Sequence, residues 1–446
     1  MIFIFILIFG VLFLFVNLRQ VAPGNKGSIL AGALVVLLPV CFICREMFWA
    51  CVGQAFLSVW LCEALLIYVG WWIFRLCRRI IVRRPMPQRT TVIAARVLLI
   101  ASFAVTGVMC VVGYFHNADY KLRDATIQLL VESPRSSFAD DSAVLADSAQ
   151  VAGDSSAAVD SAGTPVPDTS VAADSAQVAH DSAAVAFDSA QVLQDSSVTV
   201  APWNFTVLFF SDLHLDPLFC RGKVERMLRE ADSLKPDLIL FGGDFADVHD
   251  SVLTNQGYDT LFAKVATAAR VGAYAVGGNH EAYTERAGSD IAGFLRRSGW
   301  VYLDDSTVCT EVACITGRTD LQMAAARGVE RMPLSLLDPA KLGPSTSRAT
   351  PAAKGLPWLL MDHQPRGIEP EHSGRMPDFA FSGHTHAGQF FPGTVIINWV
   401  WRLAYGFGTL DSVRWLVSSG VDSWGPPVRV GSDTEMWFLR FEMRLP

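Results

Sequence analysis

Long apolar stretches dominate the first quarter of the chain. Residues 1–17 carry no charged side chain, and three further apolar stretches follow near residues 28–44, 52–74 and 93–115. Each stretch approaches the roughly 20 residues that a helix needs to cross about 30 Å of hydrocarbon. The pattern predicts four transmembrane helices within residues 1–116.

The loop between the third and fourth stretches is rich in positive charge. The loop before the third stretch carries only Arg45 beside Glu46, whereas this one carries Arg75, Arg78, Arg79, Arg83, Arg84 and Arg89. Short loops rich in Lys and Arg stay in the cytoplasm. The charge pattern therefore predicts an integral, multi-pass protein of an inner or plasma membrane, with everything after about residue 116 on the outer side.

Glu63 is a carboxylate inside the third predicted span. A charged group at that depth is a functional candidate, but a hydrogen bond to a neighbouring helix would account for it as well. The pattern contains no pair of interrupted helices of the kind that transporters use. We therefore interpret the spans as an anchor.

The composition changes to Asp, Ser, Ala and Val over residues 139–200, which contain no Lys, Arg or Glu. Aspartates recur there at a spacing of seven residues, first at Asp147 and Asp154 and again at Asp174, Asp181, Asp188 and Asp195. A heptad favours a coiled coil, but Asp and Ser are poor helix formers and Gly and Pro interrupt the repeat. We therefore interpret residues 117–202 as a juxtamembrane segment and a solvated acidic linker that holds the next domain away from the bilayer.

Residues 203–446 alternate between short apolar runs and stretches with helical periodicity. Five runs are typical of buried strands, and the periodicity between them predicts helices over residues 223–234, 260–270 and 289–297. This alternation is typical of an α/β fold, in which the carboxyl ends of parallel strands share one crevice. The runs end in polar residues: Asp212 and His214, Asp244 and Asp247, Asn279 and His280, His363, and finally His384 and His386.

Most of these polar residues are of metal-binding types. Carboxylate, amide and imidazole groups together suit a divalent ion such as Mn, Fe or Zn. Two ions about 3.5 to 4 Å apart can clamp the oxygens of an in-line displacement at phosphorus. Seven ligands are too many for one tetrahedral ion and suit two ions that share a carboxylate: Asp212, His214, Asp244, Asn279, His363, His384 and His386. The set indicates hydrolysis of a phosphate ester.

Five motifs occur in order along this region: Asp-x-His, Gly-Gly-Asp-x-x-Asp, Gly-Asn-His-Glu, His-x-Pro and Gly-His-Thr-His. Together they resemble the calcineurin-like metallophosphoesterase family over residues 203–446. The ending Gly-His-Thr-His-Ala-Gly-Gln at residues 383–389 resembles a membrane-associated branch of that family. The resemblance implies a four-layer αββα sandwich. It also implies one ion at Asp212, His214 and His386 and a second at Asn279, His363 and His384, with Asp244 bridging.

The same resemblance implies a proton donor. His280 would protonate the leaving-group oxygen, and Asp247 would orient His280 and stabilise its charge. Asp247 and Glu281 also have a simpler interpretation as capping or salt-bridging groups. His249 and His372 lie outside the motifs and are expected at the surface.

Three further positions in this region leave questions open. Asp362 precedes a predicted ligand but is expected near the ligand set rather than in it. Asp422 stands where the branch usually has a glycine, which leaves the rim of the pocket undefined. Cys309 and Cys314 face each other across a predicted hairpin, and a disulfide between them depends on an oxidising compartment.

We interpret the chain as a membrane-anchored, metal-dependent phosphoester hydrolase. The net charge of -7 and the lack of a basic stripe in the second half argue against a nucleic-acid partner. The substrate is a phosphodiester, a monoester or a pyrophosphate, and the anchor favours a lipid or an envelope precursor. Two alternatives stand beside this interpretation: a cytoplasm-facing nucleotide-lipid pyrophosphatase, and a non-catalytic metal-binding sensor. The sequence leaves the oligomeric state open.

Overall fold

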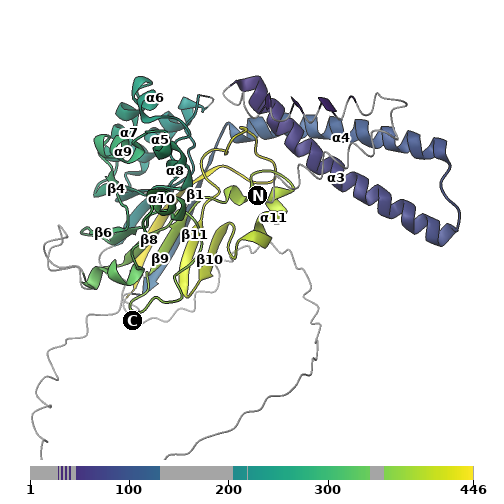
Figure 1. Ribbon diagram of the computed structural model, residues 1–446. Coiled ribbons are helices and arrows are strands. Elements are labelled where there is room, and N and C mark those ends of the chain that lie inside the picture. The colour runs from purple at the N-terminus through teal and green to yellow at the C-terminus, as the bar shows by residue number, and fades with distance from the viewer. Residues whose placement is uncertain are drawn as a thin grey trace, which may run out of the picture. The chain divides into compact units, whose positions relative to one another are not determined.

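The computed structural model describes residues 47–130, 204–217, 219–341 and 356–444, with a few more between 29 and 41. The first predicted span, most of the second and the acidic repeat lie outside the described residues. Figure 1 shows two long helices followed by strands and shorter helices.

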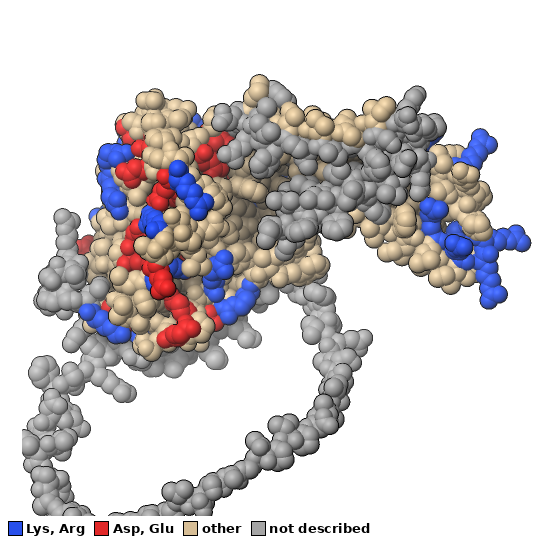
Figure 2. All heavy atoms as spheres, viewed as in Figure 1, with Lys and Arg blue, Asp and Glu red and all other residues tan. Residues whose placement is uncertain are grey.

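Two long apolar helices come first, α3 (Phe48–Val82) and α4 (Gln88–Asn117). They pack against each other, and each contains a candidate membrane span, at Val52–Val82 and Gln88–Asn117. The described residues thus contain two candidate spans where the sequence pattern predicts four in the whole chain. Basic side chains gather at the end where α3 is joined to α4, which is the predicted cytoplasmic loop (Figure 2).

Polar contacts inside this helix pair account for Glu63. Thr106 Oγ1 of α4 donates to the Glu63 carboxylate at 2.5 Å, and both side chains are buried. Nearby, Trp60 Nε1 donates to Ser102 Oγ at 3.0 Å. The structure therefore favours a helix-packing role for Glu63.

The described strands form two six-stranded sheets. The first has the order β1-β12-β2-β3-β4-β5, formed by β1 (Lys121–Leu130), β12 (Glu435–Arg444), β2 (Phe205–Phe210), β3 (Leu238–Phe241), β4 (Gly272–Ala275) and β5 (Val301–Tyr302). The second has the order β10-β11-β9-β8-β7-β6, formed by β10 (Gly406–Leu410), β11 (Val413–Val417), β9 (Phe379–Ser382), β8 (Trp358–Met361), β7 (Cys314–Gly317) and β6 (Ser306–Cys309). Strands β2 to β5 are parallel, as are β7, β8, β9 and β11. The five predicted runs are confirmed as β2, β3, β4, β8 and β9.

The helices include the three that periodicity predicts. These are α5 (Arg221–Leu234), α7 (Tyr258–Thr267) and α9 (Ile291–Arg297). In α5, Val224, Met227 and Ala231 bury one face at three- and four-residue spacing. The other helical elements are short, with too few turns for a clear period: α6 (Asp250–Asn255), α8 (Asn279–Arg286), α10 (Leu321–Arg327), α11 (Gly393–Val400), η1 (Leu334–Leu336), η2 (Pro339–Lys341) and η4 (His386–Gly388).

Apolar clusters join the layers. One packs α5, α7 and α9 on the first sheet, with Phe262 and Phe294 fully buried in it. A second joins the two sheets, where the rings of Phe209 and Phe381 lie 4.8 Å apart. On the outer face of the second sheet, Leu334 of η1 and residues of connecting loops complete a third cluster. The prediction of an α/β fold is thus confirmed. At this cluster, however, the layer that covers the second sheet consists of 3-10 turns and loops.

Strand β1 belongs to the segment that the sequence analysis placed in the juxtamembrane region and linker. It follows α4 after three residues and pairs in parallel with β12 along its whole length. β12 also pairs with β2, so the strands on either side of the acidic segment belong to one sheet. The interpretation of that segment as a spacer between the bilayer and the domain is therefore wrong, because the chain enters the sheet before the segment begins.

The predicted hairpin at Cys309 is present as β6 and β7, and Cys309 is bonded to Cys314. Such a bond stabilises a protein mainly by restricting its unfolded chain, and the sequence separation here is only 5. We expect the Cys309→Ser/Cys314→Ser protein to lose about 2 kcal/mol of unfolding free energy, as the loop-entropy relation gives for so short a loop. Denaturant unfolding of the full chain in detergent measures this. A reductant should destabilise the native protein and leave the variant unchanged, and an equal shift in both would contradict the expectation.

Candidate metal centre

The ends of β2, β3, β4, β8 and β9 bring the predicted site residues together from both sheets. Each of the seven predicted metal ligands lies within four positions of the end of its strand, and Asn279 and His280 open α8, the next element after β4. The carboxyl ends of parallel strands lie at the same edge of a sheet, and the connection between two such strands takes ten or more residues. Motifs that are far apart in the sequence therefore meet in space.

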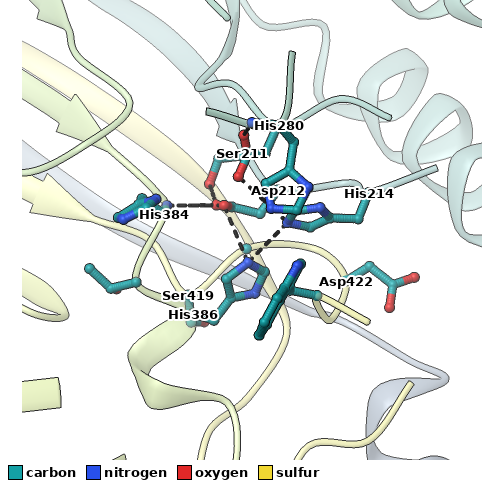
Figure 3. A network of polar contacts seen from close by, with 12 residues as sticks. Ser211, Asp212, His214, His280, His384, His386, Ser419 and Asp422 are labelled. Atoms are coloured by element: carbon teal, nitrogen blue, oxygen red, sulfur yellow. Dashed lines mark hydrogen bonds and ion pairs between the residues drawn. The ribbon is translucent and has the colours of Figure 1, made fainter. Parts of the chain in front are cut away.

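Asp212, His214 and His386 form a first group whose ligand atoms all lie within 4.8 Å of one another. His214 Nε2 is 3.1 Å from His386 Nε2, and His386 Nε2 is 3.4 Å from Asp212 Oδ1. Figure 3 shows these side chains pointing toward one another. Two imidazole nitrogens and a carboxylate oxygen directed at one point form a donor set typical of a metal site.

Asp244, His363 and His384 form a second group with the same spacing limit. His363 Nε2 lies 3.1 Å from Asp244 Oδ2 without the geometry of a hydrogen bond. The same Asp244 oxygen is 3.7 Å from His214 Nε2 of the first group. Asp244 therefore lies between the two groups.

Asn279 contributes an amide oxygen beside the second group. It lines the same cavity as Asp244 and His384, and its Oδ1 atom is buried without a hydrogen-bond partner among the described residues. Leaving such an atom unpaired costs free energy. A cation held by Asp244 and the imidazoles would satisfy it, so the residues present fit a bound metal.

The backbone of the site is strained in a consistent way. Five of the seven predicted ligands have a positive φ: Asp212 at 55°, His214 at 45°, Asp244 at 56°, His384 at 70° and His386 at 50°. Residues with a side chain rarely adopt this left-handed region, and such strain clusters at functional sites. The conformation turns each chain sharply after its strand, which aims the ligands at one another.

Two glycines make room for these ligands. Gly243 has φ 97°, and a Cβ atom there would lie 2.6 Å from His363 Nδ1. A Cβ atom on Gly278 would lie 2.2 Å from Asp244 Oδ1. Any larger residue at either position would displace a ligand.

Hydrogen bonds fix the ligand loops. His363 Nδ1 lies 2.8 Å from the Gly242 carbonyl oxygen, so this nitrogen donates and Nε2 is left free to bind a metal. The buried Glu281 carboxylate accepts from the backbone N–H groups of Gly278, Phe245 and Asp244 at 2.6, 2.8 and 3.1 Å. Glu281 thus holds the loops after β3 and β4 together, which is the capping role that the sequence left open.

His280 and Asp247 form a close pair at the edge of the site. His280 Nδ1 is 2.5 Å from Asp247 Oδ1, and His214 Nδ1 is 3.3 Å from the same oxygen. Burial raises the pKa of the Asp247 carboxyl, but the two histidines outweigh it and hold that pKa well below its usual range. Asp247 therefore stays ionised and can stabilise a positive charge on His280.

Residues 205–388 match the family model described as calcineurin-like phosphoesterase. The chain contains a calcineurin-like phosphoesterase domain. It is 30% identical over 244 residues to a bovine "Transmembrane protein with metallophosphoesterase domain", covering 52% of this chain and 52% of that protein. The zebrafish protein of the same description is 28% identical (52% and 51% covered), and an "Uncharacterized metallophosphoesterase" of Helicobacter pylori is 25% identical (52% and 59% covered). The match spans about half the length of these relatives.

Asp362, His249 and His372 belong to neither ligand group, and of the two histidines expected at the surface only His249 is exposed. Asp362 is buried, and its Oδ2 atom pairs with Arg331 Nη2 at 2.6 Å. His249 is exposed and caps α6 by accepting from the Ser251 N–H. His372 is half-buried and contacts the Arg375 carbonyl oxygen.

Arg429 is a site residue of the phosphoesterase domain that the sequence analysis did not single out. Its guanidinium is fully buried and touches His386 twice, through the carbonyl oxygen at 2.8 Å and through Nδ1 at 2.9 Å. It also donates to the carbonyl oxygens of Ser419 and Asp422, at 2.7 and 2.5 Å. The sequence signal for Arg429 was a Pro-x-Arg pattern. This pattern lies far from the ligand motifs along the chain, so it did not indicate that Arg429 contacts a ligand.

Asp422 connects the phosphoesterase domain to α4. Its carboxylate accepts from Asn117 Nδ2 of α4 at 2.8 Å and pairs with the buried Lys223 of α5 at 2.9 Å. The backbone N–H of Arg429 donates to the Gly113 carbonyl oxygen of α4 at 3.0 Å. Asp422, which replaces the usual glycine of the branch, is thus part of a buried contact between α4 and the segment from Asp422 to Arg429. That segment contacts His386.

Proposed function

We propose that this chain is a membrane-anchored phosphoester hydrolase that works with two divalent ions, with Mn, Fe or Zn as the candidates. One ion would be held by Asp212, His214 and His386 and the other by Asn279, His363 and His384, with Asp244 shared. When bound, such ions supply positive charge to the phosphoryl oxygens and lower the pKa of a water molecule. The observation that carries the proposal is the position of Asp244 between two ligand groups.

His280 is the proposed proton donor to the leaving group. Its Nδ1 atom bonds to Asp247, which leaves Nε2 for the leaving-group oxygen. His280 lines a cavity of about 550 Å³ together with Asp244, Asn279 and His384, so it faces the space in which a phosphoryl group would bind. A donor within reach of the departing oxygen contributes to catalysis by neutralising the charge that develops there.

We expect His280→Asn to lower kcat for an alkyl phosphate ester by about 10²- to 10⁴-fold, the usual contribution of general acid catalysis. The loss should be much smaller for a 4-nitrophenyl ester, because nitrophenolate leaves without a proton. Steady-state rates of the full chain on the two esters measure the difference. His249→Asn, at an exposed histidine, is the matched control. Equal losses on both esters would contradict the role of proton donor.

Manganese-dependent hydrolysis by the purified full chain tests the reaction itself. Bis(4-nitrophenyl) phosphate and 4-nitrophenyl phosphate distinguish diester from monoester activity. Release of nitrophenol from either ester supports the proposal. If neither is hydrolysed with Mn, Fe or Zn while the ions bind, the metal-binding sensor becomes the better interpretation.

The proposed location of the phosphoesterase domain is the outer side of the membrane. The basic loop between α3 and α4 supports this orientation, and the Cys309–Cys314 bond supports an oxidising compartment. A substrate that resides in the membrane, such as a lipid or an envelope precursor, would suit an anchored enzyme. A reporter active only outside the cytoplasm, inserted in the acidic segment near residue 165, tests the orientation. An inactive reporter at normal expression would favour the cytoplasm-facing pyrophosphatase.

A further inference from the structure

The cavity beside the metal ligands is lined by side chains of two chemically different kinds. Asn279 and His384 are among its polar lining residues, and Ile396, Ile397 and Trp424 are among its apolar ones. The whole cavity measures about 550 Å³, within the range of pockets for small organic ligands. A phosphoryl group alone would contact only the polar residues, so the apolar residues leave room for a second, apolar portion of the ligand.

The wall of the apolar part is α11, a helix whose own surface is also apolar. None of its residues is buried, and it carries no charged side chain. Val395, Trp399 and Val400 are 47%, 77% and 51% exposed. Contiguous apolar surface of this kind marks a site that another apolar group covers. Because α11 follows η4, which begins at His386, this surface starts next to a predicted metal ligand.

The apolar part of the cavity also reaches a candidate membrane helix. Cys62 of α3 lines it, and Cys62 lies within the span Val52–Val82. One cavity therefore connects metal-binding side chains with a helix whose outer surface suits hydrocarbon. A ligand that matches both kinds of lining has a phosphoryl headgroup and a hydrocarbon chain.

We infer that the cavity along α11 binds the hydrocarbon chain of an amphiphilic phosphoester and places its headgroup at the metal ligands. The inference rests on the proposed hydrolase function and adds the class of substrate. Ile396, Ile397 and Trp424 contact the chain, and the Trp424 ring, whose centroid is 6.3 Å from that of His280, places this apolar lining beside the proposed proton donor. Selectivity then comes from the length of the chain, because each methylene transferred from water adds to binding.

Binding of non-hydrolysable alkyl phosphonates tests the inference without requiring turnover. The full chain in lipid nanodiscs with Mn is titrated calorimetrically with methylphosphonic acid and with octylphosphonic acid, and empty nanodiscs give the blank. We expect octylphosphonic acid to bind at least about tenfold more tightly, a conservative figure for several buried methylenes. In the Ile396→Gln/Ile397→Gln protein the ratio of the two affinities should fall below about threefold, because polar amides replace the apolar wall.

Leu336→Gln is the matched control, since Leu336 is 59% exposed and does not line the cavity. It should keep the wild-type ratio. Equal or absent binding of the two phosphonates by the wild type would overturn the inference. An unchanged ratio in the double variant would also overturn it. Selective binding without hydrolysis of any nitrophenyl ester supports the chain-binding cavity and contradicts the hydrolase, so the two failures are distinguishable.

Discussion

Replacing Asp244 by Asn should abolish most phosphoester hydrolysis and reduce metal binding at both ligand groups. Asp244 Oδ2 lies 3.1 Å from His363 Nε2 and 3.7 Å from His214 Nε2, so one carboxylate serves both groups. The amide keeps the shape but removes the negative charge that a shared ligand provides to two cations. Loss of outer-shell partners of a metal costs about 10- to 100-fold, and we expect a shared ligand to cost more than about 100-fold in kcat/KM.

Two measurements separate the effects of Asp244→Asn. Elemental analysis after dialysis gives the number of ions per chain, and steady-state kinetics with excess Mn gives the residual rate. Asp232→Asn, at an exposed carboxylate on α5, is the control and should retain wild-type metal content and activity. If Asp244→Asn retained both, the two-ion arrangement around Asp244 would have to be abandoned.

The strand ends of the site could be predicted because the signal for each is local. A run such as residues 238–241 is apolar at every position, which indicates a strand buried on both faces. The residues that follow it, Gly243 and Asp244, are of types that suit a sharp turn and a metal. Strand and ligand are adjacent in the sequence, so the position of the ligand at the end of the strand can be predicted without knowledge of the fold.

Strand β1 could not be predicted in the same way. Its apolar side chains alternate with polar ones, with Ile127 and Leu129 buried, and it lies at the edge of the sheet. Its partner β12 is more than 300 residues away in the chain, as in the pairing of Arg123 with Trp437. Long-range pairing leaves no local pattern, whereas the acidic repeat beside it is conspicuous. A protein that begins at residue 200 would therefore lack β1 and leave β12 without one of its partner strands. Functional experiments thus need the full chain.

The contacts behind His386 escaped prediction for a related reason. Arg429 lies 43 residues from His386, and their two contacts depend on a turn between Ser419 and Arg429. A buried arginine is uncommon, since its charge must be offset by hydrogen bonds. Here four carbonyl oxygens and the hydroxyls of Ser423 and Ser432 supply them, and the carbonyls belong to His386, Ser419, Asp422 and Asp433. Only the folded chain brings these acceptors together.

We expect Arg429→Lys to weaken metal binding at the first ligand group by about 10- to 100-fold, the usual effect of losing a partner of a metal ligand. Burial lowers the pKa of Arg429 to about 10, so the guanidinium is charged at neutral pH. Lysine keeps that charge but lacks the planar fork that reaches His386 and Ser419 at once. His386 would then lose the hydrogen bond at its carbonyl oxygen that fixes its backbone.

A positioning role for Arg429 can be distinguished from a purely structural role, because only in the first case does excess metal restore the activity of the folded variant. If Arg429→Lys only destabilised the fold, the folded fraction would bind Mn with wild-type affinity. If Arg429 positions His386, the metal dissociation constant rises even where unfolding is negligible, and excess Mn restores part of kcat. Calorimetric Mn titration at a temperature well below the melting transition makes the distinction. Arg297→Lys, at a surface ion pair with Asp250, is the control and should change neither property, because exposed pairs contribute little. Wild-type Mn affinity in Arg429→Lys would show that the ligand His386 holds its place without the buried guanidinium.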